Sequence, residues 1–210
     1  IGGETAEHPN AFPKGKYDLA GFSVGVVEKK NILRKKKLKN GDLLISLKSS
    51  GVHSNGFSLI RELIKRKKLN LKSKIKGKNL GEILLNPTKI YVKEILELQK
   101  NIDLKSIAHI TGGGLIGNLK RIIPENIKIN LFKNSLFNFN KELFSLLQEA
   151  SNLSDEEMLN TFNCGNGMVI VINENELEKT IKSLTKLKIG FKIIGSCSNL
   201  KKGDSSVNIY

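Results

Sequence analysis

Residues 49–56 (SSGVHSNG) form the stretch whose composition is best suited to binding an anion. Glycines let a backbone approach a ligand closely, and serine hydroxyls can donate hydrogen bonds to phosphate oxygens. A helix is expected directly after this stretch, and the unpaired N–H groups at its start favour a negative charge. Loop 49–56 is therefore a candidate phosphate cradle. An ordinary loop, in which Ser54 or Asn55 only caps the helix, fits the composition equally well.

The three histidines receive different interpretations. His53 lies inside loop 49–56, where an imidazole can donate to a phosphate or transfer a proton near neutral pH. His8 is interpreted as a loop residue. His109 lies at strand spacing beside Ile107 and Ile110, so we expect a core histidine whose polar atoms are satisfied.

A second loop, Thr111-Gly112-Gly113-Gly114, lacks the spacing of a dinucleotide fingerprint and the lysine of a P-loop. Three consecutive glycines still indicate unusual backbone geometry or a close contact. Residues 163–167 (NCGNG) precede an apolar run and are compatible with a simple turn. Cys164 has no identifiable activating base beside it, which argues against a thiol nucleophile.

The best carboxylates near the start of the sequence are Glu4 and Glu7, with Thr5 between them and Asp18 further on. Carboxylates of this kind can hold a metal ion on a nucleotide or accept a proton from a substrate nitrogen. A solvated loop is the competing interpretation.

Composition excludes several classes of protein. The two cysteines among 210 residues are too few for a disulfide framework and lack metal-binding spacing. No stretch approaches the roughly 20 uninterrupted apolar residues of a membrane span, so we expect a cytoplasmic protein without a membrane partner.

The net charge of +15 is typical of nucleic-acid binding, but it comes from 31 Lys and only 4 Arg. Nucleic-acid readers favour Arg forks and stacking aromatic residues, whereas here Trp is absent and the phenylalanines do not interleave with the basic runs. We therefore expect solvated lysine-rich faces and no nucleic-acid partner.

The hydrophobic pattern predicts a mixed α/β or α+β layer structure with a domain boundary near residue 39. Two strand-loop-helix units carry the two loops, with strands at 43–47 and 107–110 and helices at 57–67 and 115–123. Asn86 and Pro87 are expected to start another helix at residue 88. The remaining expected elements are strands at 17–28, 127–132, 167–172 and, at a sheet edge, 191–195, and helices at 140–151, 155–161 and 174–188.

Six blocks in order resemble the phosphoribosylformylglycinamidine cyclo-ligase family, also called aminoimidazole ribonucleotide synthetases. They are GGETAEHP at 2–9, YDLAGFSVGVVE at 17–28, SSGVHSNGFSLIR at 49–61, LLNPTKIYVK at 84–93, IAHITGGGL at 107–115 and TFNCGNGM at 161–168. Together they cover essentially the whole chain. Six ordered blocks are far more specific than any one glycine-rich loop.

The resemblance implies the carboxy-terminal domain of the aminoimidazole ribonucleotide synthetase-like α+β fold, a mixed sheet packed with helices. Family members carry a further domain before the GGETAE block, so the resemblance implies a chain truncated at its amino end. Residues 1–39 would be the remnant of an ATP-binding, dimerising domain, including its last strand, and residues 40–210 the second domain. Such a chain is expected to be inactive alone and its full-length form to be a homodimer.

The family reaction implied is the ATP- and Mg²⁺-dependent ring closure of formylglycinamidine ribonucleotide to aminoimidazole ribonucleotide in purine biosynthesis. The resemblance assigns catalysis to His53 and Glu4, and no residue as a metal ligand. Expected substrate or phosphate contacts are Thr5, Glu7, Ser50, Gly51, Ser54, Asn55, Gly112, Gly113, Gly114, Asn163 and Gly165.

Two other functions remain open from the sequence. One is another ATP-using enzyme of the same superfamily, such as formylglycinamidine ribonucleotide synthetase, a thiamine-phosphate or selenophosphate kinase-like protein, or a hydrogenase maturation factor. The other is a noncatalytic basic binding module, suggested by the charge of +15.

Overall fold

The structure is a computed structural model that describes residues 24–33 and 37–210. The chain divides into two compact units, residues 1–32 and 33–210. In the first unit, residues 24–28 have no assigned helix or strand and lead into the short helix η1 (Lys29–Asn31). The strand predicted for residues 17–28 is wrong for residues 24–28, because no strand among the described residues pairs with them and the Val26 side chain is 99% exposed.

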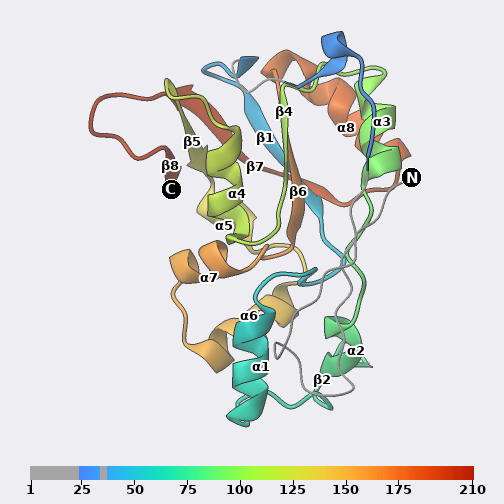
Figure 1. The fold of residues 1–210 in the computed structure, drawn as a ribbon, viewed down its shortest axis with the longest axis vertical. Helices are drawn as coiled ribbons and strands as arrows, with labels where there is room; N and C mark the ends of the chain where they lie inside the picture. The colour runs from blue at the N-terminus through green and yellow to red at the C-terminus, as the bar shows by residue number, and fades with distance from the viewer. Residues whose placement is uncertain (1–23, 34–36) are drawn as a thin grey trace, which may run out of the picture. The chain divides into compact units, whose positions relative to one another are not determined.

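The second unit is built on a six-stranded mixed sheet in the order β4-β6-β1-β7-β5-β8 (Figure 1). All neighbouring strands are antiparallel except β5 and β8, which are parallel. The strands are β1 (Leu43–Lys48), β4 (Ser106–His109), β5 (Ile127–Leu131), β6 (Asn166–Ile172), β7 (Phe191–Asn199) and β8 (Val207–Ile209). The mixed sheet packed with helices confirms the predicted α+β fold. The boundary near residue 39 stays a prediction.

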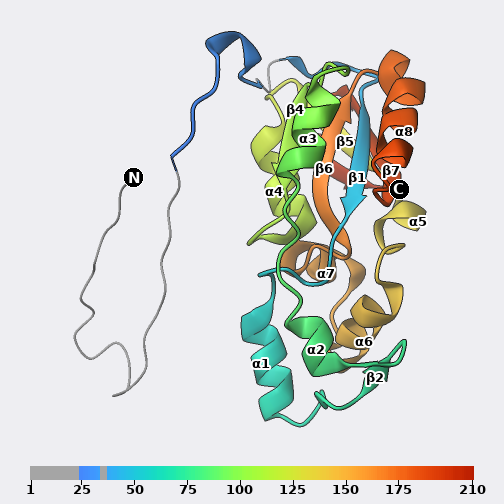
Figure 2. The same cartoon turned by 90° about the vertical axis from the view of Figure 1, so that its right-hand side faces the viewer.

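Helices cover both faces of this sheet and extend the unit beyond one of its ends. They are α1 (Phe57–Lys65), α2 (Leu80–Leu84), α3 (Val92–Gln99), α4 (Gly114–Ile122), α5 (Lys133–Leu136), α6 (Lys141–Ser151), α7 (Asp155–Thr161), η3 (Glu174–Glu176) and α8 (Leu177–Lys186). A separate two-stranded hairpin, β2 (Lys74–Ile75) with β3 (Lys78–Asn79), lies near α1, α2 and α6 beyond the lower end of the sheet (Figures 1 and 2).

The alternation of side chains along the central strands divides the interior into two cores. Leu44 of β1 packs in a core with α1, α4, α6 and α7, whereas its neighbour Ile45 packs in a second core with α3 and α8. Val171 and Ile172 of β6 divide in the same way. Successive strand residues point to opposite faces, so both faces need a helical cover, which α3 and α8 provide on one side and α4 on the other (Figure 1).

The strand directions bring the two predicted loops to one edge of the sheet. Because β6 runs antiparallel to both β1 and β4, these two strands are parallel to each other. Their carboxyl ends therefore lie at the same edge, where β6 begins. Loop 49–56 follows β1, loop 111–114 follows β4, and residues 162–165 lead into β6.

Two predicted elements are wrong in position. The helix expected from residue 88 begins only at Val92, because residues 86–90 run as irregular chain alongside loop 49–56 and exchange hydrogen bonds with it. Strand β7 was expected to be an outermost strand of the sheet, but it lies inside the sheet and pairs with both β1 and β5. Gly195 permits this pairing, since a Cβ there would lie 2.4 Å from the Asn130 carbonyl oxygen.

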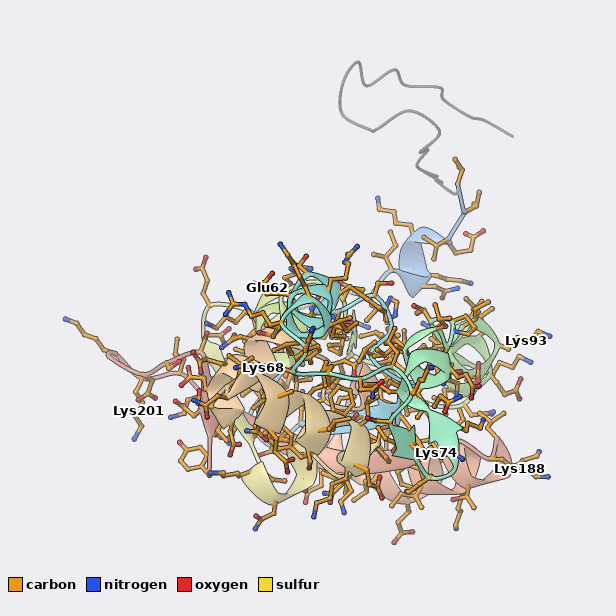
Figure 3. The ribbon with its side chains drawn as sticks, turned by 90° about the horizontal axis from the view of Figure 1, so that it is seen from below. Glu62, Lys68, Lys74, Lys93, Lys188 and Lys201 are labelled. Atoms are coloured by element: carbon orange, nitrogen blue, oxygen red, sulfur yellow. The ribbon has the colours of Figure 1, made fainter. Side chains whose placement is uncertain are left out.

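The positive charge is carried by side chains on separate elements. The lysines labelled in Figure 3 come from the segment after α1, from β2, from α3 and from the segment before β8; they are Lys68, Lys74, Lys93 and Lys201. None of these four lysines forms an ion pair with a carboxylate of the described residues. Their spread agrees with the expectation of solvated lysine-rich faces.

Candidate functional site

Loops 49–56 and 111–114 are joined by a direct hydrogen bond. The Asn55 side-chain amide donates to the Thr111 carbonyl oxygen, although the two residues are 56 positions apart. Asn55 is buried, and its Oδ1 atom has no hydrogen-bond partner among the described residues. The structure therefore brings together the two loops that the sequence singled out.

His53 is held inside loop 49–56 as a neutral imidazole. Its Nε2 atom accepts the Ser50 backbone N–H at 3.1 Å and lies 3.5 Å from the Lys89 backbone nitrogen. An Nε2 that accepts places the ring proton on Nδ1, which is buried without a partner among the described residues. Burial, followed by the nearby His109 and Lys89, lowers the pKa of His53 to about 4.

An aromatic cluster surrounds this histidine. The rings of His53, Tyr91 and His109 have centroids 6.1 to 6.3 Å apart. The Tyr91 hydroxyl donates to the Lys48 carbonyl oxygen at 2.9 Å, which ties the start of α3 to the end of β1. The Lys89 ammonium lies 5.2 Å from the centre of the Tyr91 ring and 3.6 Å from the Glu94 carboxylate.

His109 corrects the sequence interpretation, because it is exposed rather than a core residue. Its neighbours Ala108 and Ile110 fill the core on the α4 side of the sheet, so the alternation of the strand turns His109 to the opposite face. Burial of part of its surface still lowers the pKa of His109.

His109 and Lys89 line a cavity of about 490 Å³ between α3 and strands β4 and β6. Its walls are mainly apolar, from Ile95, Ile107 and Met168. An apolar cavity with a few polar groups is typical of small-molecule sites.

Two side-chain amides, from Asn163 and Asn140, hold loop 49–56 in place by hydrogen bonds. The Asn163 side chain donates to the Gly51 carbonyl oxygen at 3.0 Å and accepts the Gly165 N–H at 2.8 Å. The Asn140 side chain donates to the Ser49 carbonyl oxygen at 3.1 Å. Asn163 is completely buried and positions the loop through these bonds, and the ligand contact expected at this residue stays a prediction.

Gly165 and Cys164 belong to the same support. A Cβ on Gly165 would lie 2.3 Å from the Phe139 carbonyl oxygen, so packing alone already requires a glycine here, and the expected ligand contact stays a prediction. The buried Cys164 thiol lies 3.5 Å from the Met158 carbonyl oxygen as a weak donor, and burial raises its pKa. A buried, protonated thiol is a poor nucleophile, which agrees with the sequence interpretation.

Asn118, which the sequence analysis missed, shapes loop 111–114. Its side-chain nitrogen lies 3.0, 3.3 and 2.7 Å from the carbonyl oxygens of Thr111, Gly112 and Gly114. Gly112 and Gly113 are exposed, whereas Gly114 is buried at the start of α4. One side of the loop is therefore accessible to solvent, and the ligand contacts expected at the three glycines stay predictions.

The predicted residues therefore fall into three groups. Ser50, Gly51, His53, Ser54, Asn55 and the glycines 112–114 lie in the two joined loops, with Ser54 exposed and Ser50 Oγ donating to the Pro87 carbonyl oxygen at 2.7 Å. Asn163 and Gly165 lie behind them. Glu4, Thr5 and Glu7, with Asp18 and His8, lie outside the described residues. The sequence analysis missed Tyr91, Asn118 and Asn140, which hold the loops in place.

Residues 24–33 and 37–210 contain no group of three or more His, Cys, Asp or Glu side chains that could hold a metal ion. Within the same residues, no helix has both the length and the apolar character needed to cross a bilayer.

Stability should depend on pH through His53. A pKa of about 4 in the folded state, against 6.5 for an ordinary histidine, means that the unfolded chain binds the proton more tightly. The contribution of neutral His53 is therefore complete above pH 6.5 and is lost as pH falls from 6.5 to 4, by up to about 3 kcal/mol. Urea unfolding at pH 7.5 and pH 4.5 should show a smaller loss of stability for His53→Gln than for the wild type. Equal losses in the two proteins would contradict a low pKa for His53.

Known proteins resemble this chain over nearly its whole length. Residues 39–208 match the family described as AIR synthase related protein, C-terminal domain. The chain is 44% identical over 205 residues to a phosphoribosylformylglycinamidine cyclo-ligase of Acetivibrio thermocellus, covering 97% of this chain and 60% of that protein. It is 45% identical over 210 residues to the corresponding protein of Finegoldia magna, covering 100% of this chain and 60% of that protein. The chain thus spans about 60% of the length of these relatives.

A solved structure shows the same fold. It is that of the hydrogenase maturation protein HypE in complex with ATP, with a TM-score of 0.58 and 14% identity over 87% of this chain and 51% of that one. The resemblance to cyclo-ligases inferred from the six sequence blocks is confirmed by the two relatives. Through the match over residues 39–208, the chain belongs to the AIR synthase related family.

Proposed function

We propose that this chain supplies the substrate-facing loops of a carbon–nitrogen ligase that converts formylglycinamidine ribonucleotide to aminoimidazole ribonucleotide with ATP. Relatives at 44 and 45% identity, both named phosphoribosylformylglycinamidine cyclo-ligase, support this reaction. The observation that carries the proposal is the pair of loops joined at one sheet edge by Asn55 and Thr111. Within loop 49–56, His53 Nδ1 and Asn55 Oδ1 are buried without partners among the described residues.

Unpaired buried polar atoms cost about 1 to 3 kcal/mol each, so a ligand or water that bonds to them gains an advantage. One of these atoms is a donor and the other is an acceptor. Both belong to the loop whose helix, α1, begins at Phe57 with its amino end toward the site. We therefore propose that loop 49–56 closes on a polar ligand and satisfies these two atoms.

In the proposed reaction, ATP phosphorylates the formyl-amide oxygen, the amidine nitrogen attacks the activated carbon, and phosphate leaves. The two loops would orient the reacting ends and provide N–H donors for developing negative charge. General-base catalysis by His53 is disfavoured, because Nε2 of the neutral ring already accepts the Ser50 N–H and its pKa is low. We assign it the positioning of the loop and a hydrogen bond from Nδ1 to the ligand.

ATP and Mg²⁺ are both part of the proposal. ATP binding is supported by the family reaction and by the shared fold of HypE, which was solved in complex with ATP. Bound Mg²⁺ would neutralise phosphate charge, but the described residues do not supply a ligand set for it. Glu4 remains proposed as a catalytic carboxylate, and Thr5 and Glu7 as cleft residues. The homodimer of the full-length protein and its cytoplasmic location are also proposed.

A chimera tests the function directly. This chain would replace the matching 60% of the Finegoldia magna relative, and release of ADP would be measured with formylglycinamidine ribonucleotide and Mg²⁺. We expect turnover by the chimera and none by the 210-residue chain alone, because the latter spans only part of the relative. A chimera that binds its substrates but never forms the imidazole product would contradict the proposal.

His53→Ala in this chimera should lower kcat by on the order of tenfold to a hundredfold, because the loop loses an oriented donor. The pH–rate profile of the parent should show no limb between pH 6 and 8 that disappears in the variant. Lys93→Ala, on the outer surface of α3, serves as the control and should leave kcat unchanged. A limb near pH 7 that the variant abolishes would instead assign acid–base catalysis to His53.

The superfamily alternatives and the basic binding module make different predictions. A thiamine-phosphate kinase-like protein would release ADP with thiamine phosphate, and a formylglycinamidine ribonucleotide synthetase would require a nitrogen donor. A basic module would bind random-sequence nucleic acid tightly at physiological salt, with affinity that falls steeply as salt rises and no response to purine intermediates.

A further inference from the structure

We propose that a second cleft, on the other side of loop 49–56, binds the phosphate group of a phosphate monoester. The cleft has a volume of about 500 Å³ and is lined by loop 49–56, hairpin β2–β3, the end of α2 and the start of α6. Ser50 and Gly51 contribute to its wall. The inference rests on the proposed function for the identity of the ligand, not for the presence of the site.

The charges in this cleft are predominantly positive. Lys48, Lys76, Lys78 and Lys141 line it together with one carboxylate, Glu142. Lys76 is 2.9 Å from Glu142 and neutralises it. The other three lysines have no carboxylate partner among the described residues, so the cleft keeps three uncompensated cationic side chains. Such a set suits a dianion.

The hairpin places one of these lysines toward the cleft. Lys78 lies directly opposite Ile75 in the β2–β3 pair, so the two side chains share one face. Ile75 packs against the main core, which turns this face inward. Lys76 and Gly77 both have positive φ, as a tight two-residue turn requires, and this turn sets the register of the pair.

Helix α6 presents its amino end to the same cleft. Its cap residue, Asn140, makes no side-chain hydrogen bond to the helix, and its amide nitrogen donates to the Ser49 carbonyl oxygen. The Glu142 carboxylate accepts a hydrogen bond from its own backbone N–H, whereas the Lys141 N–H has no acceptor among the described residues. The dipole of this 11-residue helix and the Lys141 N–H add to the positive charge of the lysines, which together favour an oxyanion at this end of α6.

The volume indicates the class of ligand. A cleft of about 500 Å³ is much larger than a phosphate ion, so it has room for a sugar attached to the phosphate. Asn86 and Asn138 on its walls can bond to sugar hydroxyls. A ribose 5-phosphate group, the part of a ribonucleotide without its base, fits this description.

The test is a titration of the 210-residue chain with ribose 5-phosphate and with inorganic phosphate, followed by calorimetry or NMR shifts. We expect ribose 5-phosphate to bind more tightly than inorganic phosphate. The double variant Lys78→Ala, Lys141→Ala should weaken both affinities by at least tenfold. The matched double variant Lys93→Ala, Lys201→Ala removes the same charge from other surfaces and should bind both ligands as the wild type does.

Equal weakening by the two double variants would show binding to overall charge and would overturn the site. Unfolding curves of both double variants check that the proteins remain folded. Lys78→Gln repeats the test with a side chain that is longer than alanine. The result separates this site from the proposed reaction. Loss of phosphate binding in the cleft variant alone supports the site even if the chimera shows no ring closure, and active chimeras with unaltered phosphate binding overturn the site but not the reaction.

Discussion

Gly114→Ala should lower the free energy of unfolding by about 3 to 5 kcal/mol. A Cβ at this position would lie 2.2 Å from the Leu159 carbonyl oxygen and 2.5 Å from the Asn160 carbonyl carbon. Both are backbone atoms of α7, so no change of rotamer can relieve the contact. Gly114 also has a φ of +63°, which a side chain disfavours by about 1 kcal/mol. Helix α4 would have to separate from α7, and loop 111–114 would move with it.

The neighbouring Gly112→Ala is the control for this prediction. A Cβ on Gly112 meets no atom within 4 Å, so stability should change by less than about 0.5 kcal/mol. Urea denaturation of the two variants measures the difference. Similar midpoints for Gly112→Ala and Gly114→Ala would show that the contact between α4 and α7 is looser than the structure indicates. If Gly112 faces a ligand, its variant should lose affinity for that ligand while remaining stable.

Gly167→Ala should damage the aromatic cluster around His53. The added Cβ would lie 1.9 Å from the Tyr91 hydroxyl oxygen and 2.7 Å from His53 Cε1. We expect a loss of about 3 kcal/mol in the free energy of unfolding and displacement of both rings. Tyr91→Phe alone should cost about 1 kcal/mol, because the Lys48 carbonyl oxygen loses its donor. The double variant removes the atom that makes the shortest contact, so its loss should be smaller than the sum by about 1 to 2 kcal/mol.

Denaturation of the parent, both single variants and the double variant completes this cycle. Gly117→Ala is a suitable reference, since a Cβ there meets nothing within 4 Å and alanine is favoured over glycine inside a helix. Strict additivity of the Gly167 and Tyr91 substitutions would show that the hydroxyl is not the obstacle.

Most of the sheet and helices of residues 37–210 could be predicted from local pattern. The apolar run at β6 and the amphipathic helix α1 were found because buried positions carry apolar residues, so burial on one or both faces is visible in the sequence pattern. The Ser154 cap and its Glu157 partner mark the start of α7 in the same way. These elements depend on neighbours in sequence.

The wrong predictions arise where contacts with segments that are distant in sequence determine the local structure. Asn86 and Pro87 have the form of a helix start, but this chain instead bonds to loop 49–56, through the Pro87 carbonyl oxygen and Ser50 Oγ. The exposure of His109 depends on which face of β4 is covered at its end, which the pattern of four residues does not specify.

The candidate site follows the same division. The glycines and the small polar residues of the two loops could be found because few other residue types allow such backbone geometry. Asn118 bonds to loop 111–114 only 4 to 7 positions away, and the sequence analysis missed it. The roles of Asn140 and Asn163 could not be predicted, since their partners in loop 49–56 lie 91 and 112 positions away. Their role is visible only after the loops have been brought to one edge.

Because Cys164 is buried, its thiol can be used to measure how often the segment that holds loop 49–56 opens. Alkylating reagents attack the thiolate, and both complete burial and a raised pKa protect this sulfur in the closed state. Its labelling rate, in a chain whose other thiol at Cys197 has been replaced, therefore reports the free energy of local opening beneath loop 49–56. A ligand that orders the loop must slow the labelling in proportion to its occupancy, so binding can be followed through a residue that never touches the ligand.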